Sequence, residues 1–107
     1  MQYIKVTPMT SAGTNEPVKN QYIIAVTTCD RTFMFQSYDS LIASYNGTTL
    51  TIGAHWDYSK TTVKYFRQFL QTYCPCIFHA LPTGKSFSES MRKAIAQGIV
   101  KYEPYMI

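Results

Sequence analysis

Residues 41–52 read Leu41-Ile42-Ala43-Ser44-Tyr45-Asn46-Gly47-Thr48-Thr49-Leu50-Thr51-Ile52, and this stretch decides the fold class. Two short apolar runs flank Asn46-Gly47, a pair that tolerates the positive φ angles of a two-residue type I′ turn. One face of the resulting strand pair is apolar, so the stretch predicts a β-hairpin that covers a core. The predicted cross-strand pairs are Tyr45 with Thr48, Ala43 with Leu50, and Leu41 with Ile52.

A second pair of strands is predicted upstream of this hairpin. The runs Tyr22–Thr27 and Thr32–Tyr38 are rich in β-branched and aromatic residues, which is typical of strands. Residues 1–7 begin a further strand, whereas residues 8–20 are rich in turn-forming residues and predict a loop. If Cys29-Asp30 form the tip of the pair, one sheet face carries Tyr22, Ile24, Val26, Phe33 and Phe35.

Downstream of the hairpin the pattern changes to helical spacing. Ser59 is a typical N-cap for a helix from Lys60 to about Tyr73, which ends at Cys74-Pro75 because the residue before a proline disfavours helical geometry. The apolar residues recur at helical intervals and predict one buried stripe. That stripe consists of Val63, Phe66, Phe69, Leu70 and Tyr73.

A second helix is predicted to begin at a capping box formed by Ser86 and Glu89 and to end at Gly98. Residues 76–81 are expected to form a short strand or a packed loop, and residues 99–107 a last strand. Strands followed by helices indicate an α+β fold. We therefore expect one domain over residues 1–107, with a small antiparallel sheet of four to five strands packed against two helices.

Composition and charge narrow the class of protein. The 107 residues are 46% hydrophobic and carry a net charge of +4, with basic residues scattered along the chain. No basic segment precedes an apolar one at the start of the chain, and no apolar run approaches the ~20 residues of a membrane-spanning helix. Three cysteines make a poor disulfide framework. A cytoplasmic location in a host cell is the expectation.

Several segments resemble a family of small uncharacterised proteins from bacteriophages and prophages. These segments are 20–24, 35–43 (Phe-Gln-Ser-Tyr-Asp-Ser-Leu-Ile-Ala), 56–65 (Trp-Asp-Tyr-Ser-Lys-Thr-Thr-Val-Lys-Tyr) and 92–98. The resemblance implies a phage origin, and the family offers no activity to carry over. Between Leu70 and Met91 the chain departs from the pattern, and residues 74–81 resemble an insertion.

The segment 74–81 also contains the candidate metal ligands. Cys74, Cys76 and His79, with Cys29 or His55 as a fourth ligand, offer the thiolates and imidazole that zinc prefers. Their spacing differs from that of zinc knuckles, and no second cysteine pair completes a site. The sequence therefore favours buried free cysteines and a surface histidine, and we expect no cofactor.

A hydrolase would need a nucleophile, a base and an orienting acid, for which Ser59, His55 and Asp57 are the candidates. Ser59 is better explained as a helix cap, and alternate positions before a helix point in different directions. We expect a protein that is not an enzyme.

The best candidate surface combines a basic helix face with aromatic residues. Lys60, Lys64 and Arg67 recur at i, i+4 and i+7, with an exposed Tyr65 beside them and Trp56 and Tyr58 at the helix entry. The leading hypothesis is a phage-type accessory protein that binds a host or phage protein without catalysis. Inhibition of a host defence protein such as a CRISPR nuclease is one form of this function. The alternatives are a nucleic-acid-binding accessory protein that uses the same surface, and a structural homo-oligomer.

Overall fold

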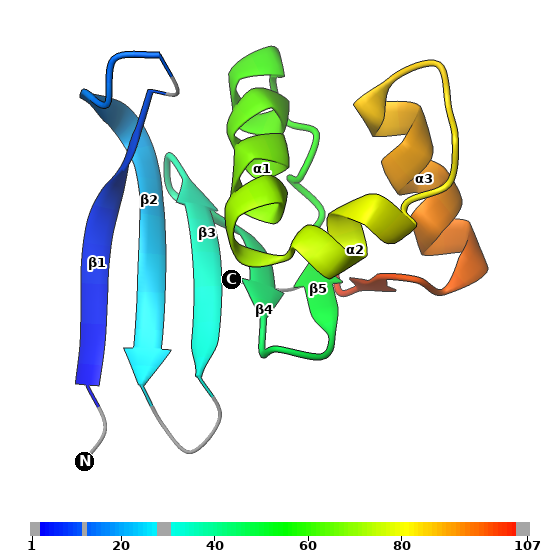
Figure 1. Ribbon diagram of the computed structural model, residues 1–107, viewed down its shortest axis with the longest axis horizontal. Coiled ribbons are helices and arrows are strands. Elements are labelled where there is room, and N and C mark those ends of the chain that lie inside the picture. The colour runs from blue at the N-terminus through cyan, green and yellow to red at the C-terminus, as the bar shows by residue number, and fades with distance from the viewer. Residues whose placement is uncertain (1–2, 12, 28–30, 105–107) are drawn as a thin grey trace.

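The computed structural model describes residues 3–11, 13–27 and 31–104, which form six strands and three helices (Figure 1). The strands form one sheet in the order β1-β2-β3-β4-β5-β6. The strands are β1 (Tyr3–Thr10), β2 (Pro17–Thr27), β3 (Thr32–Ser37), β4 (Ser40–Tyr45), β5 (Leu50–Ile52) and β6 (Lys101–Tyr102), and the helices are α1 (Lys60–Tyr73), α2 (Pro75–Ala80) and α3 (Phe87–Gln97).

The α+β class is confirmed, but the sheet has more strands than the four to five expected, and it is mixed. Strands β1 to β5 pair antiparallel with their neighbours, whereas β6 pairs parallel to β5. A parallel neighbour requires a long crossover connection, and here the three helices supply it. The last strand predicted for residues 99–107 is therefore present, as the two-residue β6.

The predicted register of β2 with β3 is wrong by one residue. Ile23 lies opposite Phe35, and Ala25 lies opposite Phe33, so these residues face the core. Ile24 and its alternating neighbours Tyr22 and Val26 consequently point away from it, because a one-residue shift turns every side chain of a strand to the other face. Val26 pairs with Thr32, so five residues of the chain separate these two partners. The expected tip, Cys29-Asp30, lies outside the described residues.

The hairpin around Asn46-Gly47 is confirmed, with a longer connection than predicted. Tyr45 pairs with Leu50 and Ala43 with Ile52, a shift of two residues that keeps these four residues on the predicted core face. Leu41, which was predicted on the same face opposite Ile52, lies on the other face instead, because the β3–β4 ladder shifts register and pairs Leu41 with Gln36. Only Gly47 of the central pair has a positive φ angle (98°), so the turn is not type I′. Instead, the Asn46 side-chain oxygen accepts hydrogen bonds from the backbone N–H groups of Thr48 (2.9 Å) and Thr49 (2.8 Å). An asparagine side chain thus replaces a backbone turn.

Most of the loop predicted for residues 8–20 is strand. Strand β1 continues to Thr10 and β2 begins at Pro17, and Met9 is buried in the core. Pro8 is tolerated because β1 is an edge strand, which leaves part of its backbone free of the ladder. The turn-forming residues are concentrated in the short connection that remains.

Helix α1 has the predicted bounds and the predicted cap. The Ser59 hydroxyl accepts a hydrogen bond from the backbone N–H of Thr62 at 3.1 Å. Phe66, Phe69 and Leu70 are fully buried against the sheet, as the stripe predicted. Val63 and Tyr73, which were also placed in that stripe, are only half-buried. Thr62 and Tyr65 are buried in their place.

The segment after α1 is helical, which corrects the expected strand or packed loop. Pro75 stands in the first turn of α2, where its missing N–H costs no hydrogen bond. Helix α3 begins after Ser86 and ends at Gly98, whose φ angle is 76°, as predicted. The Glu89 carboxylate, however, accepts from the Lys85 N–H (3.1 Å) rather than from that of Ser86. None of the helices in the described part of the chain is long and apolar enough to cross a membrane.

Candidate functional site: a cationic groove between α1 and α3

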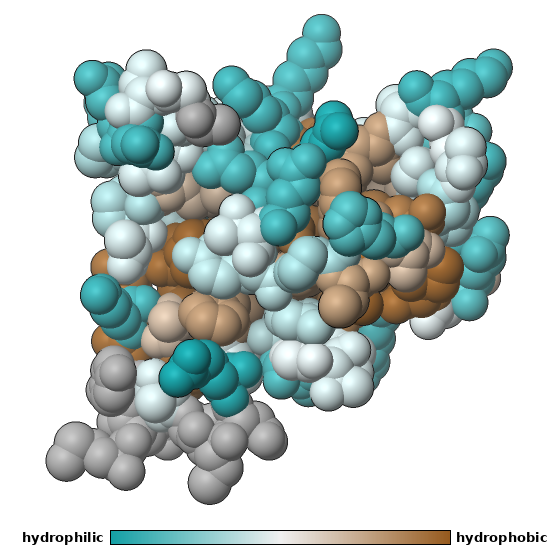
Figure 2. Space-filling model, viewed as in Figure 1, coloured by the Kyte–Doolittle hydropathy of each residue, from teal (hydrophilic) through white to brown (hydrophobic). Residues whose placement is uncertain are grey.

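A groove of about 520 Å³ runs between helices α1 and α3. In the space-filling view, hydrophilic side chains project from the upper ends of both helices, and less polar surface lies between them (Figure 2). Its lining carries four cationic side chains and one carboxylate, so its net charge is positive. The lining consists of Asp57, Ser59, Lys60, Val63, Lys64, Arg67, Phe87, Ser88 and Arg92.

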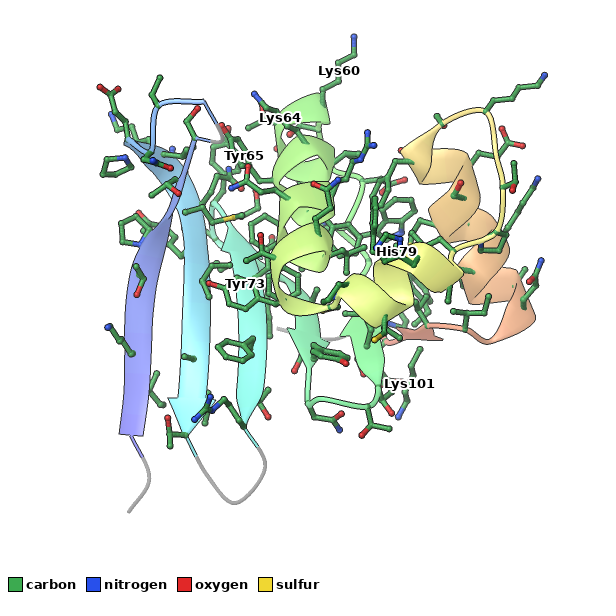
Figure 3. All side chains as sticks on the ribbon, viewed as in Figure 1. Lys60, Lys64, Tyr65, Tyr73, His79 and Lys101 are labelled. Atoms are coloured by element: carbon green, nitrogen blue, oxygen red, sulfur yellow. The ribbon has the colours of Figure 1, made fainter. Side chains whose placement is uncertain are left out.

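Helix α1 supplies one wall of this groove through its regular spacing. Lys60, Lys64 and Arg67 are exposed, and the 3.6-residue period of the helix places them on one side. Lys60 projects from the start of the helix into solvent (Figure 3). Val63 lies among them and is half-buried, which gives this wall an apolar base. The basic helix face expected from the sequence is therefore exposed.

Helix α3 supplies the opposite wall, which the sequence reasoning missed. Arg92 is exposed, and its Nη2 lies 3.4 Å from a carboxylate oxygen of Asp57 in the loop before α1. Phe87 is half-buried and lies edge-on to Phe66 of α1, with ring centres 5.7 Å apart. Pattern alone gave no sign that Arg92 would face the cations of α1, because the two helices meet only through tertiary packing.

Three aromatic rings lie beneath the groove cations. The ammonium of Lys64 is 5.3 Å from the ring centre of Tyr65, and the guanidinium of Arg67 is 5.9 Å from that of Phe78. The guanidinium of Arg92 is 5.7 Å from the Trp56 ring. Cation–π attraction at such distances favours these side-chain positions. The contacts of Arg67 and Arg92 therefore favour positions beside the groove, whereas that of Lys64 is with a ring on the sheet side of α1.

The expectation of an exposed Tyr65 is wrong. Its side chain is only 7% exposed, and it lies on the sheet side of α1 (Figure 3). Trp56 is 4% exposed and packs near Phe66. Both rings are core residues, because burial of large aromatic area outweighs what an exposed ring would gain. Of the six residues in the predicted surface, Lys60, Lys64 and Arg67 line the groove together.

Tyr58 lies outside the groove, at a second cavity. It is 71% exposed and lines a second cavity of about 520 Å³ between the β3–β4 turn and the start of α1. His55 lies edge-on to Tyr58 there, with ring centres 6.2 Å apart. Tyr38, with a φ angle of 54°, forms another part of the wall. The predicted surface is thus divided between two hollows.

The structure does not assemble the hydrolase candidates. The Ser59 hydroxyl caps α1, and Asp57 pairs with Arg92. His55 contacts the Tyr58 ring and, within the described residues, neither Asp57 nor Ser59 is hydrogen-bonded to it. The three side chains therefore serve separate local roles.

The candidate zinc ligands are also separated. Cys74 is fully buried at the end of α1, and burial raises the pKa of its thiol to about 12. Cys76 and His79 are exposed on α2. Within the described residues, no three side chains of His, Cys, Asp or Glu come close enough to bind one metal ion. Cys29, considered as a fourth ligand, lies outside the described residues.

The fold and the groove define a small α+β protein with a cationic hollow between two helices. The chain belongs to a family of unknown function (DUF8033), which matches residues 4–78. The expectation of a family without an assigned activity is confirmed, and the phage origin stays a prediction. The match includes residues 74–78, part of the segment expected to be an insertion, and it includes α1 but not α3. No curated protein and no solved structure matches the chain.

Proposed function

We propose that this protein acts without catalysis, by binding an acidic segment of another protein in the groove between α1 and α3. This proposal depends on one observation, which is that cations from two helices line a groove with an apolar base. Lys60, Lys64, Arg67 and Arg92 supply the charge, and Val63 and Phe87 supply the apolar contact. The protein is then a small phage-type accessory protein whose partner is a host or phage protein. Blocking a host defence protein is the form of this function that a phage origin favours.

An acidic protein segment fits the groove better than a nucleic acid does. Sequence-tolerant binding of single strands depends on exposed aromatic rings on which bases stack. Tyr65 and Trp56, the rings considered for that role, are buried. The half-buried Val63 and Phe87 instead suit an apolar side chain flanked by carboxylates. Without stacking, the cations would give nucleic acids only salt-sensitive, unspecific affinity.

Arg67 and Arg92 are the residues expected to dominate affinity. A guanidinium presents a planar set of donors that matches a carboxylate in a bidentate arrangement, which an ammonium does not. Arg92 already engages one carboxylate, that of Asp57, at 3.4 Å. That contact is partly exposed, so an incoming carboxylate competes for the same donors at little cost.

The test is a comparison of two charge-matched variants in affinity capture from a bacterial lysate treated with nuclease. The groove variant combines Lys60→Glu with Arg67→Glu, and so reverses one of the two arginines expected to dominate affinity. It should fold because both side chains are exposed on α1. The control combines Lys19→Glu with Lys101→Glu, two exposed lysines outside the groove, and has the same net charge. Mass spectrometry should find a set of acidic partners with the wild type and the control that the groove variant loses.

Two outcomes would contradict this function. If the groove variant captures the same proteins as the wild type, the groove does not bind them. If all proteins disappear after nuclease treatment and labelled DNA or RNA binds at low salt, the nucleic-acid alternative holds. Fluorescence anisotropy of a labelled oligonucleotide at two salt concentrations measures the latter directly.

A further inference from the structure

The sheet has one face that no described element covers. Helix α1 packs on β3 and β4, and the buried side chains of α3 belong to the same core cluster on that side (Figure 1). The register of β2 places Ile24 opposite Met34 of β3 and Val6 of β1, all on the other side of the sheet. The apolar residues on this outer face are Ile4, Val6, Pro8, Tyr22, Ile24, Val26, Met34 and Leu41.

The outer face is more apolar than a solvated sheet face. Ile4 and Val6 are 63% and 59% exposed, and they lie side by side on the outer face of edge strand β1. Strand β2 is apolar on both faces, with Ile23 buried inside and Ile24 outside. Strands that read as continuous apolar runs are typical of sheets covered on both sides. The β1 members of the face are exposed, and the apolar members on β2 to β4 are half-buried. A contiguous apolar patch that is open to solvent in this way marks an interaction surface.

The distribution of charge over the outer face indicates which partner it binds. Every outward-facing residue that the register defines on β1 to β5 is uncharged, the polar members being Thr32, Gln36, Ser44 and Thr51. The outer face carries one charge at its far edge, that of Lys101 on β6, which lies opposite Thr51. The chain as a whole carries +4. Two copies joined over the outer face of β1 to β4 therefore bring no like charges together, and the groove cations of each copy stay on the far side. This uncharged part of the face offers no ion pair to a charged partner, but it is complementary to the same part of a second copy.

We propose that the outer face binds the same face of a second copy of this chain, so that two sheets pack back to back. Stacked sheets lie about 10 Å apart with their strands within about 30° of each other. The six strands lie about 4.8 Å apart, and the longest of them, the 11-residue β2, spans about 36 Å, whereas β5 and β6 have only three and two residues. Together they cover one broad side of the molecule, whose extents are 38 × 33 × 25 Å. That side is comparable to the roughly 800 Å² per partner that a stable interface buries.

The dimer would display two cationic grooves on opposite outer surfaces. Each groove lies on the helix side of its own sheet, so pairing at the outer face covers neither. A repetitive or oligomeric acidic partner would then be bound at two points, and its apparent affinity would exceed that of one groove. The dimer does not depend on the proposed function, since its interface and the groove share no residue.

The test compares two neighbouring substitutions on edge strand β1. Val6→Lys places a charge on the outer face, and Thr7→Lys places the same charge on the inner side of the same strand, at a position that is also exposed. Sedimentation equilibrium of the full chain should give twice the 12.3 kDa mass of one chain for the wild type and for Thr7→Lys. Val6→Lys should weaken dimerisation at least about tenfold, because each dimer would bury two unpaired ammonium groups.

Met34→Lys separates this arrangement from pairing through the edge of β1. Met34 lies on β3, two strands from the edge, so the charge there should also dissociate the back-to-back dimer. A dimer that survives Met34→Lys would overturn the proposal in favour of edge pairing. A wild type that remains monomeric up to about the millimolar range of weak association would overturn it as well. The proposal would also be overturned if the protein is a monomer that binds neutral lipid vesicles and loses this binding in Val6→Lys. Circular dichroism checks that each variant is folded.

Discussion

The guanidinium carbon of Arg92 lies 5.7 Å from the centre of the Trp56 indole ring. This contact joins α3 to the loop before α1 at one side of the groove. The Arg92 side chain is 61% exposed, and exposed cation–π contacts contribute about 0.5–1 kcal/mol. We expect a double-mutant cycle of Trp56→Leu with Arg92→Ala to give a coupling of about that size.

The measurement is urea unfolding followed by circular dichroism, because Trp56 is the single tryptophan and cannot report on its own replacement. Lys93→Ala is the matched control. Lys93 is the neighbouring cation, but it contacts the backbone carbonyl of Thr83 at 2.9 Å instead. A coupling of Trp56 with Lys93 as large as that with Arg92 would show that the cycle reports general helix stability and not the ring contact.

Thr62→Val should destabilise the protein by about 1–3 kcal/mol, the cost of leaving a buried hydroxyl without a partner. The Thr62 hydroxyl lies 2.9 Å from that of Ser37 and 3.1 Å from that of Ser59, and it joins β3 to the cap of α1. Ser37 is only 2% exposed, so water does not replace the lost bond. The free energy of unfolding in urea, read from Trp56 fluorescence, measures the effect.

Thr61→Val provides the comparison for this substitution. Thr61 is the adjacent residue of α1, has the same shape and is exposed. Its replacement should change the free energy of unfolding by no more than about 0.5 kcal/mol. Equal effects at both positions would mean that helix propensity, and not the buried hydroxyl pair, determines the loss.

Features that depend on neighbours in sequence could be predicted from the sequence. Ser59, Ser86 and Gly98 each occupy a helix end whose requirements are local, and the structure places all three as predicted. Strand β2 is an element whose orientation could not be predicted from neighbouring residues alone. Its inward-facing residues include Gln21, which is fully buried, whereas Ile24 and the other outward-facing residues in its middle are apolar. Hydrophobic alternation therefore favoured the wrong face.

The residues of the candidate site also fall into two groups, those whose positions follow from local sequence and those whose positions depend on tertiary packing. The spacing of Lys60, Lys64 and Arg67 is a property of one helix, and their shared exposed face followed from it. The position of Arg92 opposite them, and the burial of Tyr65, depend on how α3 and the sheet pack around α1. No local pattern encodes that packing, so the second wall of the groove was absent from the predicted surface.

Gly47→Ala should destabilise the hairpin by about 1–2 kcal/mol, the cost of a left-handed backbone for a residue with a Cβ atom. The Gly47 φ angle is 98°, and a Cβ there would meet no atom within 4 Å, so backbone strain is the sole source of the loss. Gly13→Ala also meets no atom within 4 Å, but Gly13 does not have the left-handed φ angle. The free energy of unfolding of the Gly13→Ala variant should stay constant or rise by up to about 1 kcal/mol. Thermal unfolding of the two variants distinguishes these outcomes, and equal losses would contradict the assigned turn.

The buried thiol of Cys74 should make stability depend on alkaline pH. Burial raises its pKa from 9.0 to about 12, whereas in the unfolded chain the thiol ionises near its ordinary value. Above pH 9 the unfolded state therefore binds fewer protons than the folded state, and the free energy of unfolding falls as the pH rises toward 12. The contribution of Cys74 is the difference between the pH dependence of the wild type and that of Cys74→Ala. The variant should lose less stability over that interval.

The same burial predicts which cysteine reacts. The thiolate is the nucleophile, and Cys74 is both fully buried and protonated at neutral pH, whereas Cys76 is exposed on α2. In a Cys29→Ser background, iodoacetamide at pH 8 should alkylate Cys76 and leave Cys74 unmodified until urea unfolds the chain. Peptide mass spectrometry locates the label. Rapid labelling of Cys74 in the folded protein would mean that the end of α1 opens readily, and the packing of Cys74 against the core would then be too weak to hold α2 in place.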